Sequence, residues 1–224
     1  MNKTLALFYV NKSNKNNLKN VNSLPKDLNS VLIGIILGDG GIYRTSLKGN
    51  ARFEMSFGQK YKDFAENLGV LFKDFMSNPI KAVEIKVKDK IYQNYRLKTV
   101  SLPLFNQYHD MFYKYNSDLH KYVKIVPENI LEFLDPIALS YLIMTDGNFD
   151  KSRNRVRIYT NSYKKEEVQI LANAIITKFG IYVGVLHDRK DQWILTIGAK
   201  QLDLLRKIVS QHFHFTMLYR IGIN

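Results

Sequence analysis

The chain has 224 residues, which is enough for one large domain or two small ones. Hydrophobic residues make up 46% of it and aromatic residues 12%, so it can bury a substantial core and is not a disordered polymer. The formal net charge of +13 favours a polyanionic partner, either nucleic acid or an anionic membrane surface, over a basic but inert surface. The lack of cysteine excludes disulfides, thiolate zinc sites and a cysteine nucleophile.

No apolar run approaches the length that a bilayer span needs, so we expect no membrane partner. The first ten residues lead into an Asn- and Lys-rich stretch without a secretory cleavage pattern or a transit-peptide composition. Asn and Lys are common throughout, a bias that A/T-rich coding DNA would produce. We therefore expect a protein encoded and located in a mitochondrion or another organelle, without a targeting peptide, and favour the bacterial cytoplasm less.

The first half of the chain predicts a helix, then strands and helices in alternation. Residues 1–29 are expected to form an N-terminal arm, with Asn29 or Ser30 as the N-cap of an apolar helix over 30–39. Alternating polar and apolar residues then predict strands, and apolar residues three and four apart predict helices. This gives a strand at 52–57, a helix at 60–76, strands at 83–88 and 94–98, and a helix at 103–115.

The second half repeats this order after a linker predicted over 116–134. A helix at 136–146 is followed by a strand at 155–159, a helix at 168–179, strands at 181–185 and 193–197, and a closing helix at 202–213. A further strand near Tyr43 is compatible with the pattern. We therefore predict a tandem pseudo-repeat of the α+β class, with repeats over 30–115 and 135–224.

The two repeats begin with the same motif, an apolar helix that ends in Asp-Gly. It covers residues 32–40 and 139–147, so that Asp39 and Asp146 are its acids. Gly34 and Gly38 lie four apart on one helix face, and their lack of a side chain would let the two helices pack closely. Two carboxylates brought together in this way repel each other unless cations lie beside them. Mg²⁺ prefers oxygen ligands, and such a site suits in-line hydrolysis of phosphodiesters.

Basic and hydrogen-bonding side chains alternate with the apolar residues of the strands. A sheet with such a face can lie against double-stranded DNA, contacting phosphates for affinity and base edges for sequence. A solvated surface is the alternative interpretation of these side chains. The predicted DNA-binding residues are Arg44, Arg52, Glu54, Lys86, Lys88, Tyr92, Asn94, Arg96, Arg153, Arg155, Arg157, Tyr159, Asn161, Arg189, Lys190 and Gln192.

Both motifs resemble the LAGLIDADG motif of the homing endonuclease family, in its two-repeat monomeric form. In the first copy the direct matches are Leu32, Gly34, Ile36, Asp39 and Gly40, and Leu37 replaces the inner acid. In the second copy they are Leu139, Ile143, Asp146 and Gly147, while Tyr141 stands where the packing glycine would be. The resemblance extends from about Pro25 to Ile221 and is strongest to the intron-encoded yeast mitochondrial type.

The resemblance implies two αββαββα units around paired motif helices, with two antiparallel DNA-binding sheets. It implies that Asp39 and Asp146, with the carbonyls of Gly38 and Thr145, bind divalent cations, Mg²⁺ in the first place with Mn²⁺ as a substitute. It also implies that a monomer cuts both strands of a long asymmetric DNA site across the minor groove, leaves 3′ overhangs and promotes intron mobility. The basic catalytic residues that it suggests are Lys124, Arg220 and Lys98.

Two other functions remain open on the sequence. The same fold can host an RNA-splicing maturase, in which the basic faces would hold intron RNA and the acids need not bind metal. A DNA-binding regulator without cleavage activity is the third possibility. The five histidines do not favour a histidine-ligated metal site, because none of them shows His-Glu-x-x-His spacing.

Overall fold

The computed structural model describes residues 21–46 and 48–223, so the N-terminal arm predicted over 1–29 lies mostly outside it. The chain forms two compact units. The first contains residues 42–107 and the segment just before Pro25, and the second contains residues 25–41 and those from Tyr108 onward. The helix of the first motif therefore belongs to the second unit, and the predicted repeat bounds stay a prediction. Every helix in the described part of the chain is too short or too polar to cross a lipid bilayer.

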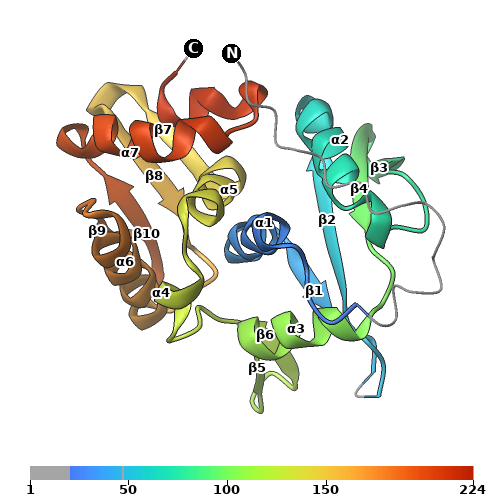
Figure 1. Ribbon diagram of the computed structural model, residues 1–224. Helices are drawn as coiled ribbons and strands as arrows, with labels where there is room; N and C mark the ends of the chain where they lie inside the picture. The colour runs from blue at the N-terminus through green and yellow to red at the C-terminus, as the bar shows by residue number, and fades with distance from the viewer. Residues whose placement is uncertain (1–20, 47, 224) are drawn as a thin grey trace. The chain divides into compact units, whose positions relative to one another are not determined.

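Helices and strands follow the predicted αββαββα order twice, with two short strands and a short helix between the two copies (Figure 1). This confirms the predicted α+β fold class. The α-helices are α1 (Lys26–Leu37), α2 (Lys62–Leu71), α3 (Asn106–Phe112), α4 (Ile130–Phe133), α5 (Pro136–Asp146), α6 (Lys165–Phe179) and α7 (Leu202–Val209). The strands are β1 (Gly41–Tyr43), β2 (Arg52–Gly58), β3 (Lys81–Val87), β4 (Lys90–Lys98), β5 (Tyr113–Asn116), β6 (Lys121–Lys124), β7 (Gly147–Asp150), β8 (Arg155–Tyr159), β9 (Gly184–Arg189) and β10 (Gln192–Ile197).

The sheet of the first unit has the strand order β1-β2-β4-β3, and its apolar face packs against α2. Alternation along β2 turns Phe53 and Phe57 toward the helix, where they contact Phe72 and Phe64 with ring centroids 5.1 Å and 5.9 Å apart. The same alternation leaves the side chains of Arg52 and Glu54 on the opposite, polar face.

The sheet of the second unit has the equivalent order, β7-β8-β10-β9, and α6 packs on it. Val156, Ile158, Leu195 and Ile197 are fully buried on the side of the helix. Arg155 and Arg157 of β8 alternate with these residues, so a polar face forms here as well.

The two motif helices, α1 and α5, pack against each other within the second unit. All residues from Ser30 to Leu37 and from Ala138 to Thr145 are buried, as helices without a polar face require. At their beginnings Asp135 joins the two helices. It accepts a hydrogen bond from the Ala138 N–H at 2.8 Å as the N-cap of α5 and one from the Ser30 hydroxyl of α1 at 2.6 Å.

The bounds of several elements differ from the prediction. Helix α1 begins at Lys26, after Pro25, and ends at Leu37, because its first turn is exposed and tolerates polar residues that the apolar pattern does not include. The helix predicted over 103–115 ends at Phe112, and Tyr113 begins a strand instead. The predicted strand at 181–185 begins at Gly184, because Ile181 and Val183 are buried in the loop before it and their alternation imitates a strand. The closing helix predicted over 202–213 ends at Val209.

Candidate metal centre and nucleic-acid interface

The two motif helices approach each other so closely that glycine is required at two positions, one within α1 and one directly after its end. A Cβ atom on Gly34 would lie 2.2 Å from the carbonyl oxygen of Ala138 and 2.9 Å from the Cβ of Tyr141. Tyr141, which replaces a glycine in the second motif, therefore packs against the glycine that the first motif retains. A Cβ on Gly38 would lie 2.0 Å from Asp146 Oδ2. The close approach thus places the carboxyl end of α5 directly beside the carboxyl end of α1.

Asp39 and Asp146 form one electrostatic site at the carboxyl ends of these helices. Asp39 is exposed, whereas Asp146 is partly buried and its Oδ2 atom has no hydrogen-bond partner among the described residues. Burial and then the charge of Asp39 raise the pKa of Asp146 to about 7, against the opposing effects of Thr145, Lys124 and Arg220. Each helix also carries about half an elementary negative charge at its carboxyl end. The site therefore concentrates negative charge and favours a cation.

Lys124 binds the end of α1. Its Nζ atom donates hydrogen bonds to the carbonyl oxygens of Ile36 at 2.9 Å, Gly38 at 2.7 Å and Gly40 at 2.7 Å. Burial lowers the pKa of Lys124 to about 8, although Asp146 and Asp39 act to raise it. An ammonium group has three hydrogens, and all three have acceptors here. Lys124 therefore caps the carbonyls that α1 leaves without partners.

Arg220 has the corresponding position at the second motif. It lies in the 3₁₀ helix η8 (Phe215–Ile221), and its Nη1 donates to the carbonyl oxygen of Gly147. Gly147 follows Asp146 just as Gly40 follows Asp39, so each motif has a basic side chain bonded to the carbonyl after its aspartate. Lys124 and Arg220 thus bind equivalent backbone carbonyls, and their predicted catalytic roles stay predictions.

One further group at this site was not predicted from the sequence. The buried Tyr163 hydroxyl donates to the Leu37 carbonyl at 2.9 Å, between the carbonyls that Lys124 binds. The contact spans 126 residues and follows a short polar loop, so no local pattern could have indicated it. Burial raises the pKa of Tyr163 well above its usual value, which keeps the hydroxyl protonated as a donor.

The residues of this site fit a divalent cation. Among the described residues, no three His, Cys, Asp or Glu side chains gather where they could hold a metal ion, so ligands beyond the two carboxylates would have to be carbonyls and water. The buried, unpartnered Oδ2 of Asp146 is a ligand of the kind that Mg²⁺ prefers. The Gly38 carbonyl, another predicted ligand, already accepts a hydrogen bond from Lys124, and a carbonyl oxygen has a second lone pair.

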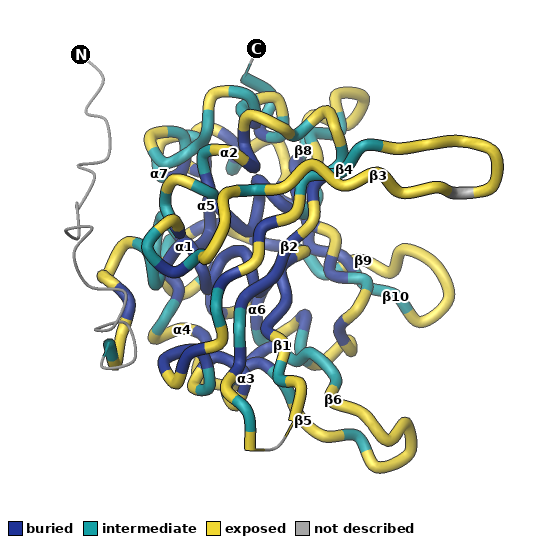
Figure 2. The backbone as a smooth tube through the Cα atoms, turned by 90° about the vertical axis from the view of Figure 1, so that its right-hand side faces the viewer, coloured by how far each residue is buried: buried dark blue, intermediate teal, exposed yellow. Residues whose placement is uncertain are grey.

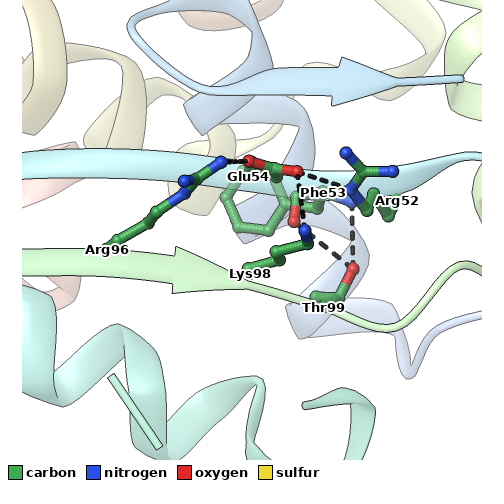
Figure 3. A network of polar contacts seen from close by, with 6 residues as sticks. All are labelled: Arg52, Phe53, Glu54, Arg96, Lys98 and Thr99. Carbon is green, nitrogen blue, oxygen red and sulfur yellow. Dashed lines mark hydrogen bonds and ion pairs between the residues drawn. The ribbon is translucent and has the colours of Figure 1, made fainter. Parts of the chain in front are cut away.

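The polar face of the first sheet is organised around a buried glutamate (Figure 3). Glu54 accepts from Arg52 Nε at 2.5 Å and from Arg96 Nη2, and Lys98 Nζ lies 3.7 Å from its Oε1. Burial acts to raise the pKa of Glu54, but the hydrogen bonds from Arg96 and Arg52 hold it below its usual value. Beside this cluster a groove of about 560 Å³ is lined by Arg52, Arg96, Lys98 and also Lys81. The face is thus a basic surface with fixed side chains.

The polar face of the second sheet has an analogous cluster around Asp150. Its Oδ2 accepts from Arg155 Nε at 3.1 Å and Arg157 Nη2 at 2.8 Å, while its Oδ1 accepts from the Ser152 hydroxyl at 2.7 Å. The hydrogen bond from Ser152 lowers the pKa of Asp150, and so do the two arginines, whereas burial acts to raise it. The result is a pKa of about 2. The alternating pattern predicted these arginines, but not the carboxylate that orients them.

The other predicted DNA-binding residues lie on or beside the two sheets. Arg44 donates to the Gly49 carbonyl at 2.8 Å in the loop after β1. In the second unit, Asn161 and Arg189 both donate to Gln192 Oε1 at 3.0 Å. The exposed members of the predicted set are Lys86, Lys88, Tyr92, Arg96, Arg153, Tyr159, Arg189 and Lys190, and Asn94 is half-buried. Lys98, predicted as a catalytic residue, lies on β4 in the first unit and pairs with Glu54.

Proteins of similar sequence are intron-encoded endonucleases and maturases. The cytochrome b mRNA maturase bI2 of Saccharomyces cerevisiae is 25% identical over 99% of this chain and 54% of its own length. The chain thus spans about half the length of that maturase. The probable intron-encoded endonuclease 1 of Wickerhamomyces canadensis is 29% identical over 90% of this chain and 87% of its own length.

Solved structures share the fold. The homing endonuclease I-WcaI bound to its DNA recognition sequence matches with a TM-score of 0.84 and 23% identity, over 98% of this chain and 96% of that one. I-DmoI in complex with DNA and Mn matches with a TM-score of 0.53 and 20% identity, over 84% and 99% of the two chains. The profile of the LAGLIDADG DNA endonuclease family matches residues 29–205, a span that contains both Asp-Gly motifs and all strands of both four-stranded sheets. The chain therefore belongs to the LAGLIDADG DNA endonuclease family.

Proposed function

We propose that the chain is a site-specific double-strand DNA endonuclease that hydrolyses phosphodiesters with a divalent metal ion. The observation that carries this proposal is the meeting of Asp39 and Asp146 at the ends of two closely packed helices, with one buried carboxylate oxygen that has no partner among the described residues. Membership of the endonuclease family supports it. Cleavage across the minor groove to leave 3′ overhangs, and promotion of intron mobility, belong to the same proposal.

Different residues of the chain would have different roles in such a reaction. Asp39 and Asp146 would hold Mg²⁺ or Mn²⁺, with the carbonyls of Gly38 and Thr145 as further ligands. When bound, the ion supplies Lewis-acid polarisation of the phosphate and an activated water for in-line attack. Lys124 and Arg220 fix the backbone on either side of the aspartates, because each is bonded to the carbonyl that follows one of them. The arginines and lysines of the two sheets would contact phosphates, and Lys98 stays a candidate for the reaction itself.

The proposed partner is double-stranded DNA with a long asymmetric recognition site, bound by a monomer. Two sheets with different side chains suit two different half-sites, which is the reason for the expected asymmetry. An organelle, in the first place the mitochondrion, is the proposed location, because the relatives named above include a cytochrome b mRNA maturase and an intron-encoded endonuclease.

The Asp39→Asn and Asp146→Asn variants test this function. Each replacement keeps the shape of the side chain but removes the charge that would bind the metal ion, so both should abolish cleavage of a randomised duplex library in Mg²⁺ while duplex binding is retained. EDTA should abolish cleavage by the unaltered protein. The matched control is Asp203→Asn, an exposed aspartate on α7, which should cut normally. Undiminished cutting by either motif variant would refute the assignment of these aspartates.

A maturase function is the second candidate, and the likeness to the yeast maturase over 99% of this chain favours it. In that role the chain would hold folded intron RNA, and the aspartates would not be needed. Splicing of the host intron by the Asp39→Asn protein, without cleavage of DNA, would support the maturase. A protein that binds one DNA site but neither cuts nor splices would instead be a silent regulator.

A further inference from the structure

The segment Tyr113–Lys124, called the finger below, is a two-stranded hairpin that pairs with neither four-stranded sheet. Its turn is fixed by a hydrogen bond from the Leu119 N–H to Asn116 Oδ1 at 2.9 Å. An isolated hairpin of this size is marginally stable in water. Here its base is held, because the Ile125 N–H donates to the Phe112 carbonyl at 2.8 Å and Lys124 binds the end of α1. Figure 2 shows that most of its length is exposed (β5 and β6).

The register of the finger gives it two unlike faces. Tyr115 pairs with Tyr122 and Tyr113 with Lys124, so three tyrosines share one face. On the other face, Asn116 pairs with Lys121, and Lys114 pairs with Val123. Lys114 and Lys121 are both exposed. The finger therefore combines an aromatic face with a cationic one.

The rings of the aromatic face form a continuous series from the interior to the surface. His109, only 4% exposed, is stacked on Tyr113 at 5.2 Å between ring centroids and lies edge-on to Tyr122 at 4.8 Å. Tyr122 in turn contacts Tyr115 at 5.5 Å. Yet Tyr122 remains 44% exposed and Tyr115 58% exposed. Single exposed aromatic residues are common. A pair of exposed tyrosines that pack on each other and on a buried ring, on a projecting hairpin, is instead typical of a binding surface.

We propose that the finger binds the unpaired bases of a single-stranded nucleic acid. Tyr115 and Tyr122 would stack on base faces, which a duplex keeps inside its own helix but a single strand offers. Lys114 and Lys121 supply the attraction to phosphates, and Asp118 is the one acidic residue of the finger. The strand can come from melted DNA or from an unpaired loop of RNA. The proposal does not depend on cleavage, since neither Asp39 nor Asp146 is part of the finger.

Equilibrium binding to fluorescent single strands of about ten nucleotides tests the proposal, with EDTA present so that no cleavage interferes. The protein is titrated onto single-stranded DNA, single-stranded RNA and a duplex of the same sequence, and Kd is measured by anisotropy. The double variant Tyr115→Ala/Tyr122→Ala should raise the Kd for at least one single strand about tenfold or more, and change the duplex Kd much less. The single strand, DNA or RNA, for which the double variant loses affinity identifies the source of the bound strand.

Two matched variants separate stacking from other effects. Tyr115→Phe/Tyr122→Phe keeps the rings and should bind like the unaltered protein, while Tyr182→Ala removes a tyrosine that is 68% exposed outside the finger and should also have no effect. In the unaltered protein, 2-aminopurine placed in the strand should lose fluorescence on binding, a readout that does not rely on any variant folding. Equal single-strand affinity of the double alanine variant and the unaltered protein would overturn the proposal. So would a loss confined to duplex binding, a loss in the phenylalanine variant, or unchanged 2-aminopurine fluorescence.

Discussion

At the scale of single residues, Lys124 uses all of its hydrogen-bonding capacity on backbone carbonyls. Three bonds of 2.7–2.9 Å leave its ammonium group no hydrogen for a phosphate or a water in this arrangement. Its place beside Asp39 therefore implies a structural contribution in addition to any role in the reaction.

Replacement of Lys124 by methionine should reveal that contribution. The change keeps most of the side-chain volume but deprives three carbonyls of their donor, so we expect the free energy of unfolding to fall by about 2–4 kcal/mol. Denaturant titration measures it. Lys121→Met, an exposed position on the same hairpin, is the control and should change stability little. If both variants were equally stable, the cap on α1 would be unimportant.

Asp150 makes the stability of the protein depend on pH, and the sign of this dependence follows from the lowered pKa of its carboxyl group. Its pKa of about 2 lies below the value of about 3.9 expected in an unfolded chain, so its stabilising effect is complete above that value and is lost as the pH falls toward 2. Asp150→Asn should therefore lose stability near neutral pH and show a flatter decline between about pH 4 and 2.

Thermal unfolding at a series of pH values checks this expectation, with Asp191→Asn at an exposed turn as the control. A variant whose curve runs parallel to that of the unaltered protein over the whole acid range would contradict it.

The sequence predicts those candidate site residues that a repeat or an alternation marks. Asp39 and Asp146 were found because the same apolar run with the same ending occurs twice, and the arginines of β8 because they alternate with buried residues. Tyr163 and Asp150 were missed for a physical reason. Tyr163 reaches Leu37 across 126 residues, and Asp150 acts through partners on a neighbouring strand, so both depend on tertiary packing that a local pattern does not contain.

At the scale of elements, the packing of α1 on α5 depends on the missing side chain of Gly34. The atom that a Cβ would meet at 2.2 Å is a backbone carbonyl, which cannot turn away as a side chain could. Gly34→Ala should therefore push the helices apart and reduce the free energy of unfolding by about 1–3 kcal/mol or more, although alanine favours a helix over glycine.

The control for this change is Gly198→Ala, because nothing lies within 4 Å of a Cβ at that position and its φ of −78° suits alanine. Urea denaturation curves of the two variants should differ clearly. A Gly34→Ala protein as stable as its control would show that the helix pair is looser than described.

The two motif helices also show where prediction of an element succeeds. The bounds of α5 were predicted correctly, because Asp135 and Pro136 mark a helix start and Gly147 follows its end. Helix α1 instead begins after Pro25, so the N-cap predicted at Asn29 or Ser30 is wrong, and its exposed first turn could not be inferred from an apolar pattern. For residues 113–124 the sequence pattern predicts a helix end and a linker instead of the hairpin, because the two short strands alternate over too few residues to be recognised.

At the scale of the whole molecule, the charge of +13 makes duplex binding sensitive to salt. If six or more phosphates are neutralised, affinity should fall roughly a thousandfold or more between about 50 and about 200 mM salt. The combined change Arg96→Gln/Lys98→Gln should reduce the slope of log K against log salt by about 2, one for each lost phosphate contact.

Anisotropy titrations over a range of salt concentrations measure the slope. Lys178→Gln/Lys207→Gln removes the same charge from exposed positions on the helices α6 and α7, outside the strands of both sheets, and should leave the slope unchanged. Identical slopes for the two double variants would mean that only the net charge matters and that the polar face of the first sheet makes no phosphate contact.

The enclosure of α1 by α5 has a consequence for synthesis of the chain. The ends of the two helices are 107 residues apart, from Asp39 to Asp146, so at about 5–20 residues per second α1 emerges from the ribosome about 5–20 s before its partner. During this interval a helix that is buried on all sides from Ser30 to Leu37 lacks the surface that covers it. Translation thus exposes one of the most apolar segments early and covers it late, so we expect chaperones to bind the nascent chain and correct folding to depend on the speed of elongation.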